Sequence, residues 1–189
     1  GKLNGLVIAP GEVFSFWHLI GRPTAKSGFK AGPTFENGRM VTSFGGGLCQ
    51  ISGLIFNLAL ESGCEILERS SHSLDAYGER RYLPLGRDAT VAWMSKDLVF
   101  RNVSGIPIRL VLNVERTRAF GHVEGIEEMP FNVRIDREDF DSIRSNAETK
   151  YVDAIVTRAI SSETHEWRDA GRFTSQYRTP AAEKLNISP

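Results

Sequence analysis

The sequence predicts an α+β fold in which one buried helix packs on an antiparallel sheet. A long apolar segment follows the glycines at positions 45–47 and stops before Gly63, a typical cap for the C-terminal end of a helix. Short segments of alternating polar and apolar residues, separated by short turns, occupy much of the remaining chain. No strand-helix-strand repeat is present that would require a parallel sheet. One helix and several antiparallel strands therefore define the class.

The composition is typical of a globular domain and shows no excess of either charge. The chain has 189 residues, of which 41% are hydrophobic and 24% are charged. It carries 23 basic and 23 acidic side chains, a balance that argues against binding to nucleic acid or an anionic membrane. No apolar run approaches the roughly 20 residues that cross a bilayer, so no transmembrane segment is expected in this chain. No signal peptide is visible, and the compartment stays open between the cytoplasm and the cell envelope.

The segments before the glycines are predicted to form strands. Residues 12–16 alternate polar with apolar side chains, as a half-buried strand does. Residues 33–36 and 39–42 flank Asn37-Gly38, a dipeptide typical of type I′ hairpin turns because both positions need a positive φ. This hairpin leads directly to the three glycines.

The helix is expected over residues 49–62 and is apolar on most of its circumference. Polar or small side chains recur along one narrow stripe, at Gln50, Gly53, Asn57 and Glu61. At 100° per residue, Cys49 lies beside this stripe. We therefore expect a buried helix with one edge open to a polar site or to solvent.

The chain after the helix predicts a meander of short strands and then a change of composition. Strands are expected over residues 65–69, 88–93, 97–102, 106–114, 120–126 and 131–135. From residue 136 onward the chain becomes polar, with one isolated strand expected over residues 151–156. This pattern predicts a domain over residues 1–136 and a polar C-terminal extension over residues 137–189 that is partly disordered.

The two cysteines, Cys49 and Cys64, are expected to stay unpaired. At the two ends of one helix they would be roughly 20 Å apart, given a rise of about 1.5 Å per residue. A disulfide needs Cα atoms within about 7 Å. Cys49 is thus predicted to be a free thiol in the first turn of the helix, where unpaired N–H groups and the helix dipole favour a thiolate. The alternative is that Cys49 is a small buried residue behind a tight glycine turn.

A Cys-His-Asp arrangement is the strongest candidate for chemistry. Nucleophilic cysteine catalysis needs a thiolate, a base for its proton and a group that orients the base. We assign these roles to Cys49, His72 and Asp88, with Asp75 and Asn102 as alternative orienting groups. Each role has a structural alternative, in which His72 is an exposed loop residue and Asp88 is an ion-paired residue at a strand end.

The residues around Cys49 are candidates for binding the reacting group. Backbone N–H groups of the glycine loop, together with Gln50 or Ser52, are predicted to form an oxyanion hole. The candidate ligand-binding residues are Gly45, Gly46, Gly47, Gln50 and Ser52. No metal site is expected, because Cys49 and His72 lack the closely paired ligands of structural zinc sites, and no cofactor is implied.

The chain resembles the VanW family, which is named for an accessory protein of some vancomycin-resistance gene clusters. The resemblance covers roughly residues 3–126 and rests on the stretches 3–5, 10–16, 37–38, 45–52, 68–73, 86–90 and 97–102. It implies a bacterial origin and a link to cell-wall peptidoglycan or to the response to glycopeptide antibiotics. Many members carry export or membrane-anchoring segments, and this chain shows none.

A second resemblance, at the level of the fold, concerns the chemistry. A cysteine at a helix start, then a histidine after the next strand, then an aspartate is similar to the core of transglutaminase-like and papain-like enzymes. The chain departs from papain-like enzymes at Gln50, which follows the cysteine where those enzymes place a glutamine well before it. The aromatic residue that usually follows the cysteine is also absent.

Two functions of different classes follow from these patterns. The first is a cysteine-dependent acyl-transfer enzyme or amidase that acts on peptidoglycan stem peptides or a related amide. The second is a non-catalytic module whose glycine loop and helix N-terminus bind a cell-wall peptide or another anionic ligand. A third interpretation is an accessory subunit in which the glycines and Cys49 only shape the core.

Overall fold

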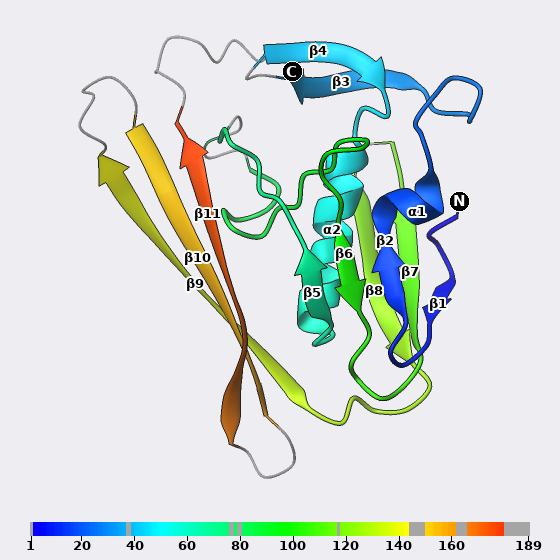
Figure 1. The fold of residues 1–189 in the computed structure, drawn as a ribbon, viewed down its shortest axis with the longest axis vertical. Coiled ribbons are helices and arrows are strands. Elements are labelled where there is room, and N and C mark those ends of the chain that lie inside the picture. Colours follow the sequence, from blue (N-terminus) through cyan, green and yellow to red (C-terminus); the bar gives the residue numbers. More distant parts are fainter. Residues whose placement is uncertain are drawn as a thin grey trace.

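The computed structural model describes residues 2–36, 39–75, 78, 81–116, 118–143, 150–161 and 166–179. Within these ranges the chain is mostly antiparallel sheet with two helices, which confirms the α+β class. Figure 1 shows the helix α2 (Leu48–Glu61) at the centre, with strands in front of it and behind it.

Two three-stranded sheets enclose α2. One sheet has the order β2-β6-β5, formed by Val13–Ser15, Val99–Arg101 and Glu65–Glu68. The other has the order β1-β7-β8, formed by Leu6–Ile8, Ile108–Val114 and Ala119–Gly125. The helix contacts β5 on one side and β8 on the other (Figure 1). All neighbouring strands of these sheets are antiparallel, as the short turns predicted.

The predicted central helix is confirmed to within one residue at each end. Its apolar faces supply much of the main core, including the fully buried Ile55, Phe56 and Leu60. The middle of its polar stripe faces the loop before Ala89, whereas Gln50 and Glu61 at the two ends of the stripe are exposed. In the middle, Asn57 Nδ2 donates to the Arg87 carbonyl oxygen at 2.7 Å. Asn57 is therefore a buried polar residue that satisfies a backbone group of this loop.

The predicted hairpin before the glycines is also present. Strand β3 (Ala31–Glu36) pairs with β4 (Arg39–Phe44), and the Asn37-Gly38 turn itself lies outside the described residues. The helix α1 (Phe16–Ile20) follows β2, and the Ser15 hydroxyl accepts the His18 N–H at 3.1 Å as its N-cap. Asp97 secures this corner, because its carboxylate accepts the Ser15 hydroxyl at 2.6 Å.

The segment over residues 88–93, predicted as a strand, does not form one. It makes only two isolated bridges, Ser70 with Thr90 and Ala92 with Lys96. The helix holds this segment instead, since the buried Ser52 hydroxyl donates to the Ala89 carbonyl oxygen at 2.6 Å. The Ser52 side chain thus takes the place of a backbone hydrogen bond that a neighbouring strand would have made to Ala89.

The C-terminal third differs most from the sequence-based expectation. Instead of one isolated strand, it forms three long antiparallel strands, β9 (Asn132–Ile143), β10 (Lys150–Ser161) and β11 (Trp167–Arg178), in the order β11-β10-β9. Long runs of backbone hydrogen bonds hold these polar strands together. Such hydrogen bonds do not require alternating apolar side chains, so the amino-acid sequence shows no clear strand pattern here. The division at residue 136 stays a prediction, although β9 runs across it.

This C-terminal sheet docks against α2 and the loop that follows β5. Phe173 meets Phe56 edge to face, with ring centroids 5.9 Å apart. A second small core contains Leu85, Ala154 and Tyr177. The docking brings β11 beside the residues that were predicted to carry chemistry.

Candidate active site

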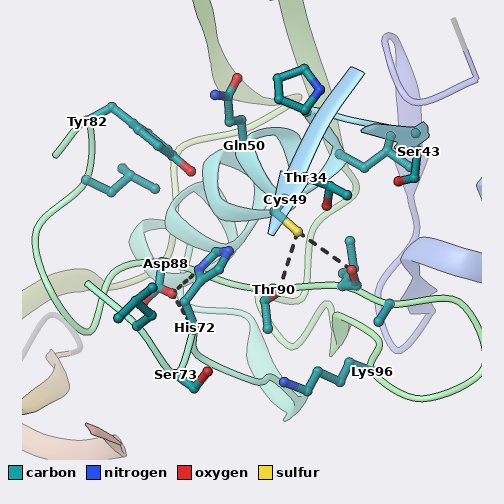
Figure 2. Close-up of a pocket in the computed structure, with 18 of the residues that line it drawn as sticks. Thr34, Ser43, Cys49, Gln50, His72, Ser73, Tyr82, Asp88, Thr90 and Lys96 are labelled. Carbon is teal, nitrogen blue, oxygen red and sulfur yellow. Dashed lines mark hydrogen bonds and ion pairs between the residues drawn. The ribbon is translucent and has the colours of Figure 1, made fainter. Parts of the chain in front are cut away.

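One large cavity opens at the N-terminal end of α2. Its volume is about 840 Å³, and Cys49, His72 and Asp88 all line it. Further lining comes from β3, β4, the segment over residues 81–85 and the turn over residues 91–96. In Figure 2 the His72 imidazole lies between Cys49 and Asp88. The structure therefore brings the three predicted catalytic residues together.

The glycine loop fixes where the helix begins. Gly47 is the N-cap residue and has a φ of 89°, a conformation that side chains with a Cβ rarely adopt. Gly46 lies against β3 so closely that an added Cβ would be 2.4 Å from the carbonyl carbon of Gly32. The two glycines thus permit a turn and a close approach that place Cys49 in the first helical turn.

The Cys49 sulfur sits in a polar niche formed by the segment after Ala89. Sγ lies 3.4 Å from Thr90 Oγ1 and 3.6 Å from the Val91 carbonyl oxygen. Burial raises the pKa of the Cys49 thiol, but His72, Thr90 and the Val91 backbone outweigh burial and hold the pKa below its ordinary value. The structure therefore favours a thiolate at Cys49.

His72 is held by Asp88 through two hydrogen bonds. Imidazole Nδ1 lies 2.6 Å from Asp88 Oδ2, and the His72 backbone N–H donates to the same oxygen at 2.8 Å. Burial lowers the pKa of His72, but the hydrogen bond to Asp88 and the proximity of Cys49 outweigh burial and raise the pKa to about 9. The two shifts both favour a thiolate at Cys49 beside an imidazolium at His72.

No hydrogen bond of normal geometry joins Cys49 Sγ to the His72 ring. The two groups are nevertheless close enough for each to shift the pKa of the other. Catalytic hydrogen bonds often align only when substrate is bound. The arrangement therefore needs only a small side-chain adjustment to pass a proton between Nε2 and a group bound at the sulfur.

Asp88 is kept ionised by Arg69 and His72, which precede it in the chain, and by Tyr177 near the C-terminal end of β11. Its Oδ1 accepts Arg69 Nη2 at 3.0 Å and also accepts the Tyr177 hydroxyl. Burial raises the pKa of Asp88, but its hydrogen bonds to His72 and the charge of Arg69 hold the pKa below its ordinary value. A charged Asp88 keeps the His72 Nδ1 proton in place and turns Nε2 toward the cavity.

The predicted ligand-binding residues divide into two groups. Gly45, Gly47 and Gln50 line the cavity. Gly46 is packed against Gly32, and Ser52 is buried with its hydroxyl bonded to the carbonyl oxygens of Cys49 and Ala89. Ser52 therefore positions the segment below the site and does not face the cavity.

The alternative candidates have other partners, although Asp75 lines the same cavity. Asp75 pairs with Arg81 at 2.8 Å, and the Asn102 amide donates to the Ile8 carbonyl oxygen at 2.9 Å, so neither orients His72. His18 is exposed, and His122 lies 3.2 Å from Glu124 on β8. His165 is outside the described residues.

Three residues of the site were not assigned from the sequence. Thr90 contacts the nucleophile, whereas Arg69 and Tyr177 hold Asp88. Arg69 is the last residue of a predicted strand, but nothing in its sequence context shows that the side chain is buried. Tyr177 lies in a polar segment with no predicted strand, so only the pairing of β11 could have revealed it.

Cys64 provides a contrast within the same chain. It is fully buried at the other end of α2, and burial raises its pKa to about 12. Both cysteines are free thiols, as their predicted separation required. Only Cys49 combines access to the cavity with a lowered pKa, so it is the thiol expected to react in the folded protein.

The described residues contain neither a group of side chains that could bind a metal ion nor a helix that could span a membrane. No group of three or more His, Cys, Asp or Glu side chains among them is arranged to hold a metal ion. Likewise, no helix in the described part of the chain has the length and apolar character to cross a bilayer.

Comparison with known proteins then places the chain. The family described as "VanW like protein" matches residues 1–123, which include Cys49, His72 and Asp88. The chain belongs to this family. The VanW-like match ends within β8, so the three strands of the C-terminal sheet lie beyond it.

Two curated relatives support the VanW-like assignment. The chain is 38% identical over 106 residues to "Uncharacterized protein YoaR" of Bacillus subtilis, covering 56% of this chain and 34% of the relative. It is 35% identical over 122 residues to "Vancomycin B-type resistance protein VanW" of Enterococcus faecalis, covering 64% of this chain and 44% of the relative. The chain thus spans less than half the length of either relative. No solved structure shows a significant match.

Replacing Tyr177 by phenylalanine should destabilise the fold and the site together. The change removes a hydroxyl that donates to Asp88 and accepts the buried Gly86 N–H at 2.8 Å. An unsatisfied buried donor costs about 1–3 kcal/mol, so the free energy of unfolding in urea should fall by that amount. The exposed Thr174→Val on the same strand removes a hydroxyl outside the site and is the matched control. Equal stability of the two variants would contradict the role given to Tyr177.

Proposed function

We propose that this chain is a cysteine-dependent acyl-transfer enzyme or amidase that acts on a peptidoglycan-related peptide. The observation that carries the proposal is the charged His72–Asp88 pair beside a low-pKa Cys49 at the floor of a cavity. A nucleophile, a base and a group that orients the base are the three components of nucleophilic cysteine catalysis.

The first half-reaction would transfer an acyl group to Cys49. The thiolate attacks the carbonyl carbon of a bound amide, and the carbonyl electrons move onto oxygen. The carbon–nitrogen bond then breaks, and the His72 imidazolium gives its Nε2 proton to the departing amine. The products are a thioester at Cys49, a free amine and a neutral His72.

The second half-reaction would release the acyl group. Neutral His72 takes a proton from water or from an acceptor amine as that group attacks the thioester carbon. The carbon–sulfur bond breaks, and Cys49 leaves as a thiolate beside the restored imidazolium. Water as the attacking group gives an amidase, and an amine gives a transferase.

The start of α2 offers donors for the oxyanion. Within the described residues, the Cys49 backbone N–H has no hydrogen-bond acceptor, as expected in a first helical turn. The exposed Gln50 side chain lies at the same rim of the cavity. These two groups are the proposed oxyanion donors.

The proposed substrate class comes from the family. One relative is named a vancomycin B-type resistance protein, and that name links this family to cell-wall chemistry. We extend the link to this chain as a proposal, with residues 1–136 as the catalytic domain. The chain order Cys49, His72, Asp88 is also that of transglutaminase-like and papain-like enzymes, which supports the acyl-transfer chemistry.

An acylation experiment tests the proposal. p-Nitrophenyl acetate should release a burst of p-nitrophenolate stoichiometric with protein, and mass spectrometry should find one acetyl group on Cys49. The Cys49→Ala variant should show no burst, whereas Cys64→Ala should retain it. Soluble stem peptides from digested peptidoglycan, incubated with each variant, would then identify the amide that is cleaved or transferred.

The same experiment separates catalysis from binding alone. A module that only binds its ligand would show no acetylation of Cys49 above the rate of a free thiol. It would also leave the stem peptides chemically unchanged. Either result would overturn the proposed enzyme.

A further inference from the structure

Both carboxylates that line the cavity have a cationic partner, but one lysine that lines it has no anionic partner among the described residues. Its two carboxylates, Asp75 and Asp88, are each engaged by a cationic partner, at 2.8 Å for Asp75–Arg81 and 3.0 Å for Asp88–Arg69. Lys96 also lines the cavity, but none of the described residues forms an ion pair or a hydrogen bond with its ammonium group. The cavity therefore holds one uncompensated positive charge in addition to the His72 imidazolium.

The backbone that carries Lys96 is held firmly. Its N–H and carbonyl both pair with Ala92, at 2.9 and 3.0 Å, across a tight turn. Trp17 Nε1 donates to the same Lys96 carbonyl oxygen at 2.8 Å. These three hydrogen bonds fix the backbone position from which the side chain extends.

The Lys96 side chain lines the same cavity as the nucleophile Cys49. In Figure 2 it runs from the turn toward Thr90 and Ser73. Thr90 is the residue whose hydroxyl lies 3.4 Å from Cys49 Sγ. An anionic group bound at Lys96 would thus lie in the cavity that contains the reacting sulfur.

We infer that Lys96 forms a subsite for a carboxylate of the substrate, next to the amide that reacts with Cys49. The inference rests on the proposed function and adds a substrate class to it, namely amides that carry a free carboxylate near the scissile bond. An unpaired ammonium in a partly enclosed cavity attracts an anion more strongly than an exposed lysine does, because the surrounding protein lowers the local dielectric.

A pair of alkylating reagents tests this subsite directly. Iodoacetate and iodoacetamide both lose iodide as the Cys49 thiolate attacks their methylene carbon, but only iodoacetate is an anion. In Lys96→Met, the rate constant for iodoacetate should fall about fivefold at low salt, while that for iodoacetamide stays within about twofold of wild type. The difference should shrink as salt increases. Lys26→Met, an exposed lysine outside the cavity lining, is the matched control.

Binding without chemistry provides an independent measurement. In Cys49→Ala, titration with acetylglycine should shift the amide resonances of Ser73 and Thr90, and the neutral acetylglycinamide should shift them far less. Adding Lys96→Met should abolish the preference for the anion. N-acetyl-aspartic acid α-amide, whose only carboxylate is on the side chain, distinguishes a side-chain carboxylate from one at a peptide C-terminus.

The outcomes separate the two proposals. If Cys49 reacts rapidly but Lys96→Met leaves the ratio of the two rate constants unchanged, the subsite is wrong and the proposed enzyme stands. If Cys49 is unreactive, the proposed enzyme fails, and the titration alone decides whether Lys96 binds an anion. Equal binding of acetylglycine to Cys49→Ala with and without Lys96→Met would also overturn the subsite.

Discussion

Replacing Asp88 by asparagine is expected to lower the rate of Cys49 acylation by about 10³–10⁴-fold. Asp88 accepts the Nδ1 proton of His72 at 2.6 Å, which leaves Nε2 directed at the cavity. An asparagine amide can instead donate to Nδ1, and the imidazole would then hold its proton on Nε2. That tautomer cannot accept the Cys49 proton at Nε2, so the thiolate that attacks the ester would not form. The p-nitrophenolate burst measures this rate.

The same substitution should weaken the fold. The side chain of Arg69 is 4% exposed and that of Asp88 13% exposed, so a neutral residue leaves a buried guanidinium without its counter-charge. Breaking a buried pair in this way typically costs about 3–5 kcal/mol. Urea unfolding at pH 7 should show a loss of this size.

The free energy of unfolding measured at acidic pH gives a further check on Asp88. Because the pKa of Asp88 is lowered on folding, the unfolded chain takes up the proton first as pH falls. Its contribution to stability is therefore present above about pH 3.9 and is lost as pH falls through the folded pKa. The Asp88→Asn variant should lack this part of the loss at acidic pH.

Asp75→Asn is the matched control for Asp88→Asn. Asp75 is also a buried cavity carboxylate paired with an arginine, but it does not touch His72. Asp75→Asn should therefore reduce stability and leave the pH dependence of Cys49 alkylation unchanged. If both variants lowered reactivity equally, general loosening of the cavity would explain the effect, and Asp88 would have no specific role.

Replacing His72 by alanine is expected to slow Cys49 alkylation at pH 7 by at least about tenfold, because each unit of pKa changes the thiolate fraction by that factor. In the wild type, His72 helps to hold the pKa of Cys49 below its ordinary value against the effect of burial. Without the imidazolium, burial raises the pKa of Cys49 and the thiol becomes the main form at pH 7. The rate of iodoacetamide alkylation between pH 5 and pH 10 measures the shift.

His122→Ala is the control for the His72 prediction, because His122 is an exposed histidine on β8 outside the cavity. Its alkylation profile should match that of the wild type. In the wild type, acyl transfer should also decline above a pH of about 9, since the pKa of His72 is raised to about 9 and the proton donor is lost above it. An unchanged alkylation profile in His72→Ala would show that the thiolate does not depend on the imidazolium.

The fold was predicted best where the signal is local. The apolar helix with a glycine at each end was located to within one residue, and the strands on either side of Asn37-Gly38 pair as expected. Helical periodicity and turn chemistry act over a few residues, so they can be recognised in a sequence. The strand predicted over residues 88–93 is absent because side chains from α2 replace its backbone partners.

The three candidate catalytic residues could be predicted from the sequence, but their supporting contacts could not. Cys49, His72 and Asp88 were chosen by chemistry and chain order, and the structure places them around one cavity. The choice between Asp88 and Asp75 as partner of His72 was open, because both follow His72 within a short distance in the chain. Ser52 was assigned to ligand binding from its position near Cys49, but the helix turns its hydroxyl toward Ala89.

The sequence by itself determined the class, the central helix with Cys49 in its first turn, and the family. Only the tertiary structure decided what holds the site together. Arg69 and Tyr177 meet at Asp88 although 89 residues separate Tyr177 from Asp88 in the chain. That meeting depends on how β9, β10 and β11 pair and dock. Backbone hydrogen bonds between polar strands leave little trace in the order of side chains, so the support for the site became visible only in the folded chain.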